Sequence, residues 1–250
     1  MSNHGLPCWY ELTSADPDAS ATFYAGLFGW TWADADMPGM DYRLAKLDGA
    51  SIAGMMNAEP GQPLAWLIYY AVDNCDATVA LASALGSHVL VPPADIPGTG
   101  RFSIFLDPQG AAVGILQPLP MGDGSSGGAF DQQKAGHGNW HELLCPDPTA
   151  ALDFYGKLFG WTLARAVEMG PDMTYHVFKR GDLDIGGMFA GDKALMWKPY
   201  FGTLSAKAAM DKIVATGGTV LRGLDEVPGG IFTVQLKDPS GALLAVVGPA

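Results

Sequence analysis

A tryptophan followed two residues later by a glutamate occurs at two places in the chain, as Trp9 with Glu11 and as Trp140 with Glu142. Both stretches are short and apolar, which is typical of a strand, and side chains two residues apart on a strand share one face. A carboxylate among aromatic walls can have a raised pKa and act as a general acid or base. It can equally bind a ligand hydroxyl, pair with a cation, or be satisfied by backbone amides at the rim of a cavity. Glu11 and Glu142 are therefore the candidate catalytic residues.

Further aromatic and methionine residues recur at matching places in the two halves of the chain. Large aromatic side chains with a few polar groups are what small-molecule pockets use. The same residue types are also common in cores, and methionine fills core gaps as readily as it lines pockets. The candidate substrate-binding residues are Trp9, Trp140, Trp66, Trp197, Tyr42, Tyr175, Met55 and Met188.

Two patterns that suggest a metal centre fail on spacing. His137 and His141 precede Glu142, but strand alternation places Glu142 on the opposite face from both histidines. The segment WHELL lacks the second histidine of a helical zinc motif. The cysteines at 8, 75 and 145 are too few and too far apart for a disulfide framework or a zinc knuckle.

The two W-x-E segments belong to a longer repeat. Aligning Trp9 with Trp140 also aligns the FY and LFGWT segments that follow, and more than half of the positions from 9 to 31 are identical in the second copy. Near the end of each half, DPQG at 107–110 matches DPSG at 238–241 at the same offset. The chain therefore contains two copies of one unit.

The boundary between the copies is marked by composition. The segment GDGSSGG at 122–128 is typical of a flexible linker. We predict a first domain over 1–118, a linker over 119–136 and a second domain over 137–250.

Each half is predicted to contain a strand, a helix and three strands, twice over. Asp16 is a capping residue, Pro17 is tolerated in a first helical turn, and Gly29 ends the helix. A second helix is expected from Asn74 to Leu85. Strands are expected over 9–13, 31–34, 42–47, 51–56, 66–72, 88–92, 101–106 and 111–116, and the DPxG segments are reverse turns.

Two such modules per half, with an LFGW helix end and a DPxG turn before the last strand, resemble the vicinal oxygen chelate superfamily. That superfamily includes glyoxalase I, bleomycin-resistance proteins and extradiol dioxygenases. The resemblance covers nearly the whole chain and is similar to the bacterial double-domain glyoxalase-like proteins, which often carry a hydroxylase label. It implies an α+β fold of four βαβββ modules forming two tandem glyoxalase-like domains, whose curved mixed sheets each half-wrap a cavity.

The resemblance also implies where a metal ion would be held. Metal-dependent members bind a divalent ion in the cavity through His, Glu or Gln. Carried over one position at a time, those ligand positions hold Trp9 and Trp140, Gly54 and Gly187, Leu67 and Lys198, and Gly114 and Ala245. None of these side chains can hold a divalent ion. We therefore expect no metal ion and no other cofactor, and not the usual glyoxalase I mechanism.

Composition limits the partners. A net charge of −12 argues against nucleic acid and anionic membranes, which bind clustered Lys and Arg. The N-terminal segment lacks a basic stretch followed by an apolar one, so we expect no secretory signal and a cytoplasmic location. The expected partner is a small-molecule ligand. The fused repeat predicts a monomer with internal pseudo-twofold symmetry.

Two functions remain open from the sequence. The first is a metal-independent lyase or isomerase that acts on a small carbonyl compound, with Glu11 and Glu142 as proton-transfer groups. The second is a non-catalytic protein that sequesters an aromatic or cationic metabolite or antibiotic, as bleomycin-resistance proteins do. Indole rings beside an acidic rim would suit a planar cation. Loss of activity on replacing both glutamates would favour the enzyme.

Overall fold

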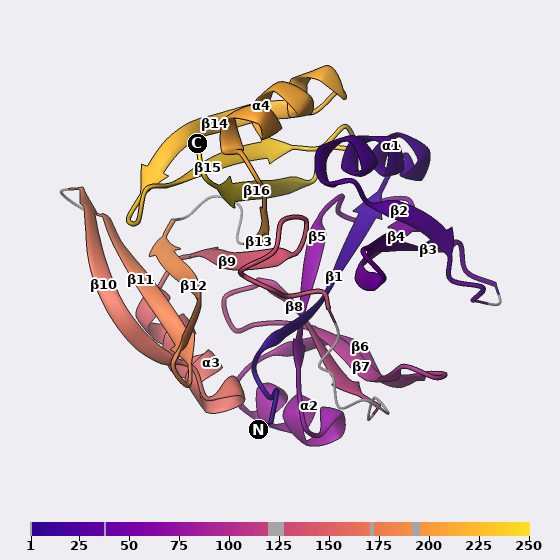
Figure 1. The fold of residues 1–250 in the computed structure, drawn as a ribbon. Coiled ribbons are helices and arrows are strands. Elements are labelled where there is room, and N and C mark those ends of the chain that lie inside the picture. Colours follow the sequence, from indigo (N-terminus) through magenta and orange to yellow (C-terminus); the bar gives the residue numbers. More distant parts are fainter. Residues whose placement is uncertain (1, 38, 120–127, 171–172, 192–195) are drawn as a thin grey trace. The chain divides into compact units, whose positions relative to one another are not determined.

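The computed structural model describes residues 2–37, 39–119, 128–170, 173–191 and 196–250. The described residues form sixteen strands and four helices in the order strand, helix, three strands, repeated four times (Figure 1). The predicted α+β architecture of four βαβββ modules is therefore confirmed. Within the described ranges, no helix combines the length and apolar character needed to cross a membrane.

The elements of the two halves correspond one to one. The first half contains β1 (Pro7–Ser14), α1 (Pro17–Phe28), β2 (Thr31–Asp34), β3 (Tyr42–Leu47), β4 (Ala50–Asn57), β5 (Trp66–Ala71), α2 (Cys75–Ala84), β6 (His88–Ile96), β7 (Gly100–Leu106) and β8 (Ala112–Pro118). The second half contains β9 (Gly138–Cys145), α3 (Pro148–Phe159), β10 (Thr162–Gly170), β11 (Met173–Arg180), β12 (Leu183–Ala190), β13 (Met196–Gly202), α4 (Ala206–Ala215), β14 (Thr219–Val227), β15 (Ile231–Lys237) and β16 (Leu243–Gly248).

Each half forms one eight-stranded mixed sheet. The strand order is β2-β3-β4-β1-β5-β8-β7-β6 in the first sheet and β10-β11-β12-β9-β13-β16-β15-β14 in the second. The first strand of a module pairs parallel with its fourth, as β1 does with β4 and β9 with β12. The second, third and fourth strands pair antiparallel in sequence order. The helix between the first two strands provides the crossover that a parallel pair needs.

The first helix of each half begins and ends at the predicted residues. The Asp16 side chain accepts a hydrogen bond from the Ala19 N–H at 3.0 Å, and Gly29 ends α1 in the left-handed conformation with φ 77°. Asp147 and Gly160 do the same for α3, where φ of the glycine is 72°. A residue with a Cβ would be strained at these two glycines, which explains the G of the LFGW segment.

Strand β6 extends beyond its predicted end at Pro92 and runs to Ile96. Proline cannot donate to a strand ladder, which is why the sequence predicts a stop there. However, β6 is the edge strand of its sheet, and its pairing with β7 is irregular between Val91 and Ala94. The strand therefore accommodates its two prolines where the pairing with β7 is already interrupted.

The strands that carry the W-x-E segments have two distinct faces. On β1, Tyr10, Leu12 and Ser14 are buried, whereas Trp9 and Glu11 are half-buried. This alternation confirms that Trp9 and Glu11 share one face of the sheet, opposite the side chain of Tyr10. Glu11 lies beside Gly54 of β4 in the ladder, and on β9 the equivalent glutamate lies beside the equivalent glycine of β12.

The chain divides into two compact units that do not follow the two halves. Unit 1 comprises Met1–Cys8, Ile68–Ser126 and Trp140–Trp197, and unit 2 comprises Trp9–Leu67, Gly127–Asn139 and Lys198–Ala250. Each unit thus takes one module from each half. The domain boundaries at 118 and 137 stay a prediction, and most of the GDGSSGG segment (122–127) lies outside the described residues.

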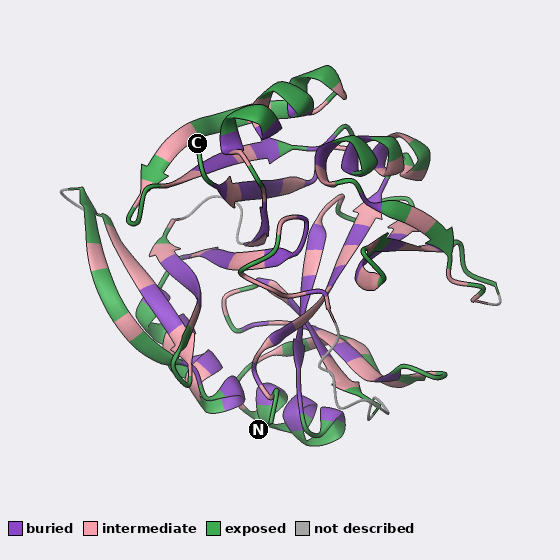
Figure 2. Ribbon diagram, viewed as in Figure 1, coloured by how far each residue is buried: buried purple, intermediate pink, exposed green. Residues whose placement is uncertain are grey.

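Each unit contains its own aromatic core. In unit 2, the ring of Tyr24 lies 5.4 Å from the rings of both Trp30 and Trp66, centroid to centroid. In unit 1, the ring of Tyr155 lies 5.5 Å from that of Trp197. Figure 2 shows that the strands carry much of the buried surface and that each helix has one buried and one exposed side. The FY segments of α1 and α3 supply the buried sides.

Candidate functional site

In unit 2, three predicted site residues form one hydrogen-bond chain. Trp9 Nε1 donates to the Tyr42 hydroxyl at 3.0 Å, and the Tyr42 hydroxyl donates to Glu11 Oε2 at 3.0 Å. Trp9 and Glu11 come from β1, and Tyr42 begins β3 on the far side of β4. The sequence predicts the two strands that carry these residues, at 9–13 and 42–47, but only the structure shows that the residues are bonded in series.

Unit 1 contains the same chain of three residues. Trp140 Nε1 donates to the Tyr175 hydroxyl at 2.8 Å, and that hydroxyl donates to Glu142 Oε2 at 3.4 Å. The second bond is longer than its equivalent in unit 2. Glu142 is buried, with 8% of its surface exposed. The two glutamates therefore accept equivalent hydrogen bonds, and we call each set of three residues a Trp–Tyr–Glu chain.

A glycine makes room for the tyrosine in both chains. A Cβ at Gly54 would lie 1.8 Å from the Tyr42 hydroxyl, and a Cβ at Gly187 would lie 2.1 Å from Cζ of Tyr175. No side chain could occupy either position without displacing the ring. The two glycines stand where the resemblance places a metal ligand, so the tyrosine fills the space that a ligand side chain would need.

Electrostatics sets the direction of the hydrogen bonds. Burial raises the pKa of Tyr42 and of Tyr175 well above the ordinary tyrosine value, and the nearby carboxylates of Glu11 and Glu142 raise it further. Both hydroxyls therefore stay protonated and donate. A carboxylate offers several acceptor directions and can accept more than one hydrogen bond. Chemically, the arrangement is an oriented acceptor that could receive a proton or a ligand hydroxyl.

Trp66 and Trp197 lie apart from these chains. Each is 4% exposed, and its Nε1 donates to the hydroxyl of a core tyrosine, Tyr24 at 3.0 Å or Tyr155 at 3.1 Å. Both methionines, Met55 and Met188, are fully buried. The structure gives these four residues a place in the packed interior, and their assignment to substrate binding stays a prediction.

Sequence reasoning missed a role of the DPxG segments beyond the turn. The turns form as predicted, but the aspartates also accept hydrogen bonds from core tyrosines, Tyr24 to Asp238 Oδ2 at 2.9 Å and Tyr155 to Asp107 Oδ2 at 2.8 Å. The signal was present, because the FY tyrosine and the DPxG aspartate both recur in each half. We call these arrangements Trp–Tyr–Asp chains. They tie one module to another within each unit.

The histidines beside Glu142 do not build a metal centre. His141 is fully buried on the face of β9 opposite Glu142, and its Nδ1–H donates to the Ile185 carbonyl at 2.7 Å. Burial lowers the pKa of His141 to about 4. Across the described part of the chain, no three His, Cys, Asp or Glu side chains are grouped so as to hold a metal ion.

The positions inferred for metal ligands do not fit a divalent ion. The indoles of Trp9 and Trp140 donate hydrogen bonds, and an indole nitrogen offers no lone pair to a metal. A Cβ at Gly114 would lie 2.5 Å from the Tyr69 ring, which fills that place. Lys198 donates to Gln235 Oε1 at 2.9 Å. This donor set is wrong for the usual ion.

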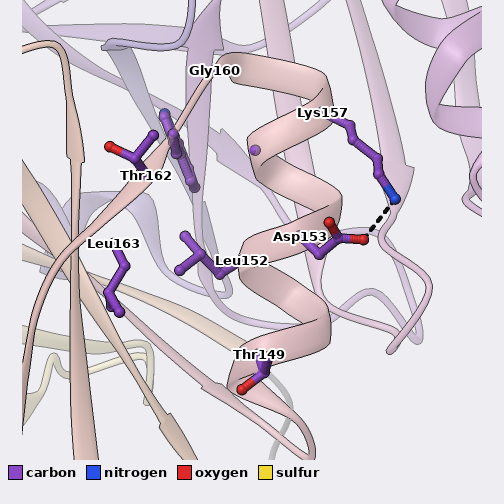
Figure 3. Close-up of a pocket in the computed structure, with 9 residues that line it drawn as sticks. Thr149, Leu152, Asp153, Lys157, Gly160, Thr162 and Leu163 are labelled. Carbon is purple, nitrogen blue, oxygen red and sulfur yellow. Dashed lines mark hydrogen bonds and ion pairs between the residues drawn. The ribbon is translucent and has the colours of Figure 1, made fainter.

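A surface hollow of about 520 Å³ lies elsewhere, against α3 and β10 in unit 1. Figure 3 shows Thr149, Leu152 and Leu163 along its side, and Lys157 paired with Asp153 at 2.6 Å. None of the predicted site residues lines this hollow. Its ion pair is exposed and of the kind that stabilises a helix surface.

Solved structures share this fold. The 2,3-dioxygenase LapB from Pseudomonas sp. KL28 matches with a TM-score of 0.70 at 14% identity, covering 100% of this chain and 94% of that one. The Mn(II)-bound glyoxalase from Novosphingobium aromaticivorans matches with a TM-score of 0.70 at 17% identity, covering 99% and 83%. At such identities the likeness shows the fold alone.

Relatives by sequence match along almost their whole length. "Putative glyoxylase CFP32" of Mycobacterium tuberculosis is 36% identical, covering 98% of this chain and 95% of its own. "Anthracycline biosynthesis protein DnrV" of Streptomyces peucetius is 31% identical, covering 97% and 93%. The model of the Glyoxalase/Bleomycin resistance protein/Dioxygenase superfamily matches twice, at 8–115 and 139–246. With most of each half matched, the chain belongs to the glyoxalase/bleomycin resistance protein/dioxygenase superfamily, as two tandem copies of its domain.

Proposed function

We propose that this chain is a metal-independent lyase or isomerase that moves a proton on a small carbonyl compound, with Glu11 and Glu142 as the proton-transfer groups. The observation that carries the proposal is the Trp–Tyr–Glu chain, which occurs in both units. In both, the positions inferred for metal ligands hold residues that do not fit a divalent ion. The relative from Mycobacterium tuberculosis, named as a glyoxylase, supports the carbonyl substrate.

Each of the three residues would have a separate role in the reaction. The glutamate takes a proton from the hydroxyl-bearing carbon next to the carbonyl group and returns it to the former carbonyl carbon, while the hydroxyl proton passes to the former carbonyl oxygen, so an α-hydroxycarbonyl compound becomes its isomer and the protons balance. The tyrosine hydroxyl fixes the carboxylate through its hydrogen bond, at 3.0 Å for Tyr42 and Glu11. The tryptophan N–H binds the lone pair of that hydroxyl, which directs the hydroxyl hydrogen at the carboxylate.

A second candidate is the sequestration of an aromatic or cationic metabolite or antibiotic. Trp9 and Trp140 are half-buried at the head of each Trp–Tyr–Glu chain, so part of each indole is accessible to a ligand. A planar compound could stack on that indole and donate a hydroxyl to the carboxylate. The relative named for anthracycline biosynthesis favours a planar aromatic ligand.

The test combines a reaction with a binding measurement. Proton NMR would follow exchange of carbon-bound hydrogen of dihydroxyacetone and hydroxyacetone in D₂O, and tryptophan fluorescence would follow binding of the planar dye quinizarin. The double variant Glu11→Gln, Glu142→Gln is compared with Glu59→Gln, which changes an exposed glutamate. We expect the double variant to exchange at least about a hundredfold more slowly than the wild type, and the control to match the wild type.

The outcomes separate the two functions. Quinizarin binding that the double variant weakens, without exchange in any protein, would establish the binding protein instead of the enzyme. Exchange at the wild-type rate in the double variant would contradict the role of both glutamates. If the wild type neither exchanges hydrogen nor binds quinizarin, both functions are contradicted for these compounds.

A further inference from the structure

The face of the fourth module that carries Lys198 has a chemistry of its own. On β13, Trp197 and Phe201 belong to the buried side, and alternation puts Lys198 and Tyr200 on the other side of the strand. Lys198 is half-buried. Lys198 thus places a positive charge on this face of a chain whose net charge is −12.

Neighbouring strands complete a small cradle around this ammonium. In the ladder, Ala245 of β16 lies between Tyr200 of β13 and Gln235 of β15, so the three side chains share one face. Lys198 Nζ donates to Gln235 Oε1 at 2.9 Å and lies 5.5 Å from the centre of the Tyr200 ring. The small side chain of Ala245 lies between the Tyr200 ring and the Gln235 amide.

The polar groups of this cradle are hydrogen-bond donors. A lysine ammonium has three N–H groups and no acceptor. Because Gln235 Oε1 accepts from Lys198, the remaining polar group of that amide is its NH₂, which also donates. The face of the Tyr200 ring attracts the ammonium and helps to hold it in place. Donors of this kind, with a positive charge among them, match an anionic oxygen.

The equivalent face of the second module has none of these donors. The residue equivalent to Lys198 is Leu67, the one equivalent to Gln235 is Ile104, and the one equivalent to Ala245 is Gly114. Gly114 lies between Tyr69 and Ile104 in the ladder, as Ala245 lies between its neighbours. The two halves thus share the backbone of this cradle and differ in its charge.

We propose that Lys198 and Gln235 form a binding subsite for an anionic oxygen of the ligand, a carboxylate, sulfonate or phenolate on an aromatic ring, and that the first half has no such subsite. This inference rests on the second candidate function, the binding of a planar aromatic compound, because it assigns a charge to that ligand. It makes the two halves unequal, with the second half selecting an anion.

The test uses two dyes, quinizarin and its sulfonate, which differ by one sulfonate group and its negative charge. Dissociation constants are measured by fluorescence titration for the wild type and for Lys198→Met, Lys198→Arg and Leu67→Met, with circular dichroism as a check on folding. Leu67→Met is the matched control, because it places methionine at the equivalent position of the first half. A charge-assisted hydrogen bond predicts that the wild type binds the sulfonate about tenfold or more tightly than quinizarin.

The proposal expects Lys198→Met to lose this preference while binding quinizarin as the wild type does. Lys198→Arg and Leu67→Met should keep it. Equal binding of the two dyes by the wild type, or a preference that persists in Lys198→Met, would overturn the subsite and leave the proposed function standing. Failure of the wild type to bind either dye would overturn both the subsite and the sequestration of a planar compound, whereas the proton-transfer function is decided separately by the exchange measurement.

Discussion

The first and third modules are nearly interchangeable, whereas the second and fourth are not. Both W-x-E strands carry a Trp–Tyr–Glu chain, with the same glycine on the neighbouring strand. Strands β5 and β13, by contrast, differ at the equivalent positions Leu67 and Lys198. The repeated hydrogen bonds therefore define what the halves have in common, and Lys198 marks a place where their side chains differ.

The Trp–Tyr–Asp chains belong to the common part. Each joins a tyrosine of one half to an aspartate of the other, through Tyr24 with Asp238 and Tyr155 with Asp107. Their tyrosines, Tyr24 and Tyr155, are among the largest fully buried side chains. If the halves are equivalent in architecture, then equal damage to the two chains should have equal cost.

The largest effect is expected from Asp107→Ala and Asp238→Ala. Each change removes a charged acceptor from a buried tyrosine hydroxyl and from backbone N–H groups of the turn. We expect each to lower the free energy of unfolding by about 4 kcal/mol in urea titrations. Asp182→Ala, at an exposed turn, serves as the control and should change it little. A large loss for one aspartate and none for the other would break the equivalence.

A pH-dependent difference should follow from His141, whose counterpart in the first half is Tyr10. Burial lowers the pKa of His141 from 6.5 to about 4, so between these values the unfolded state binds more protons than the folded state. Stability is therefore lost as the pH falls from about 6.5 towards 4.

Replacing His141 with Phe should remove this part of the pH dependence. Between pH 7 and pH 4, the wild type should lose about 3 kcal/mol more than His141→Phe in urea unfolding. Tyr10→Phe is the matched control and should keep the wild-type slope. Parallel slopes for the wild type and His141→Phe would show that the ring is not held neutral.

The smallest effect is expected from Tyr42→Phe and Tyr175→Phe. Each removes the hydroxyl between a tryptophan and a glutamate, at a cost of about 1 kcal/mol in the free energy of unfolding. The Tyr42 bond to Glu11 is 3.0 Å and the Tyr175 bond to Glu142 is 3.4 Å, so Tyr42→Phe should cost more. The reverse order would show that the bond lengths do not rank the two chains.

Local patterns were sufficient to predict the elements. Asp16 and Gly29 delimit α1 because a cap and a left-handed glycine act on their immediate neighbours. The exception, β6 beyond Pro92, depends on the strand being at an edge, and a single sequence does not show sheet order. Element boundaries were therefore predictable where their cause is local.

The bonds of the candidate site could be predicted only in part. Strand alternation placed Trp9 and Glu11 on one face, but Tyr42 joins them from another strand. Asp238 reaches Tyr24 across most of the chain, and the DPxG segment is already explained by its turn. Such partners are determined by the tertiary fold. In the sequence, they are indicated only by their recurrence in both halves.

The interlaced units have a consequence for synthesis on the ribosome. The core of unit 2 takes Tyr24 from the start of the chain and Asp238 from near its end. During translation, the aromatic residues of α1 and its neighbours emerge long before the strands that cover them, and must wait in a partly open state. Such a nascent chain exposes apolar surface to chaperones and to other chains. Slow or paused translation of the last module should therefore lower the yield of folded protein more than a pause at any earlier point.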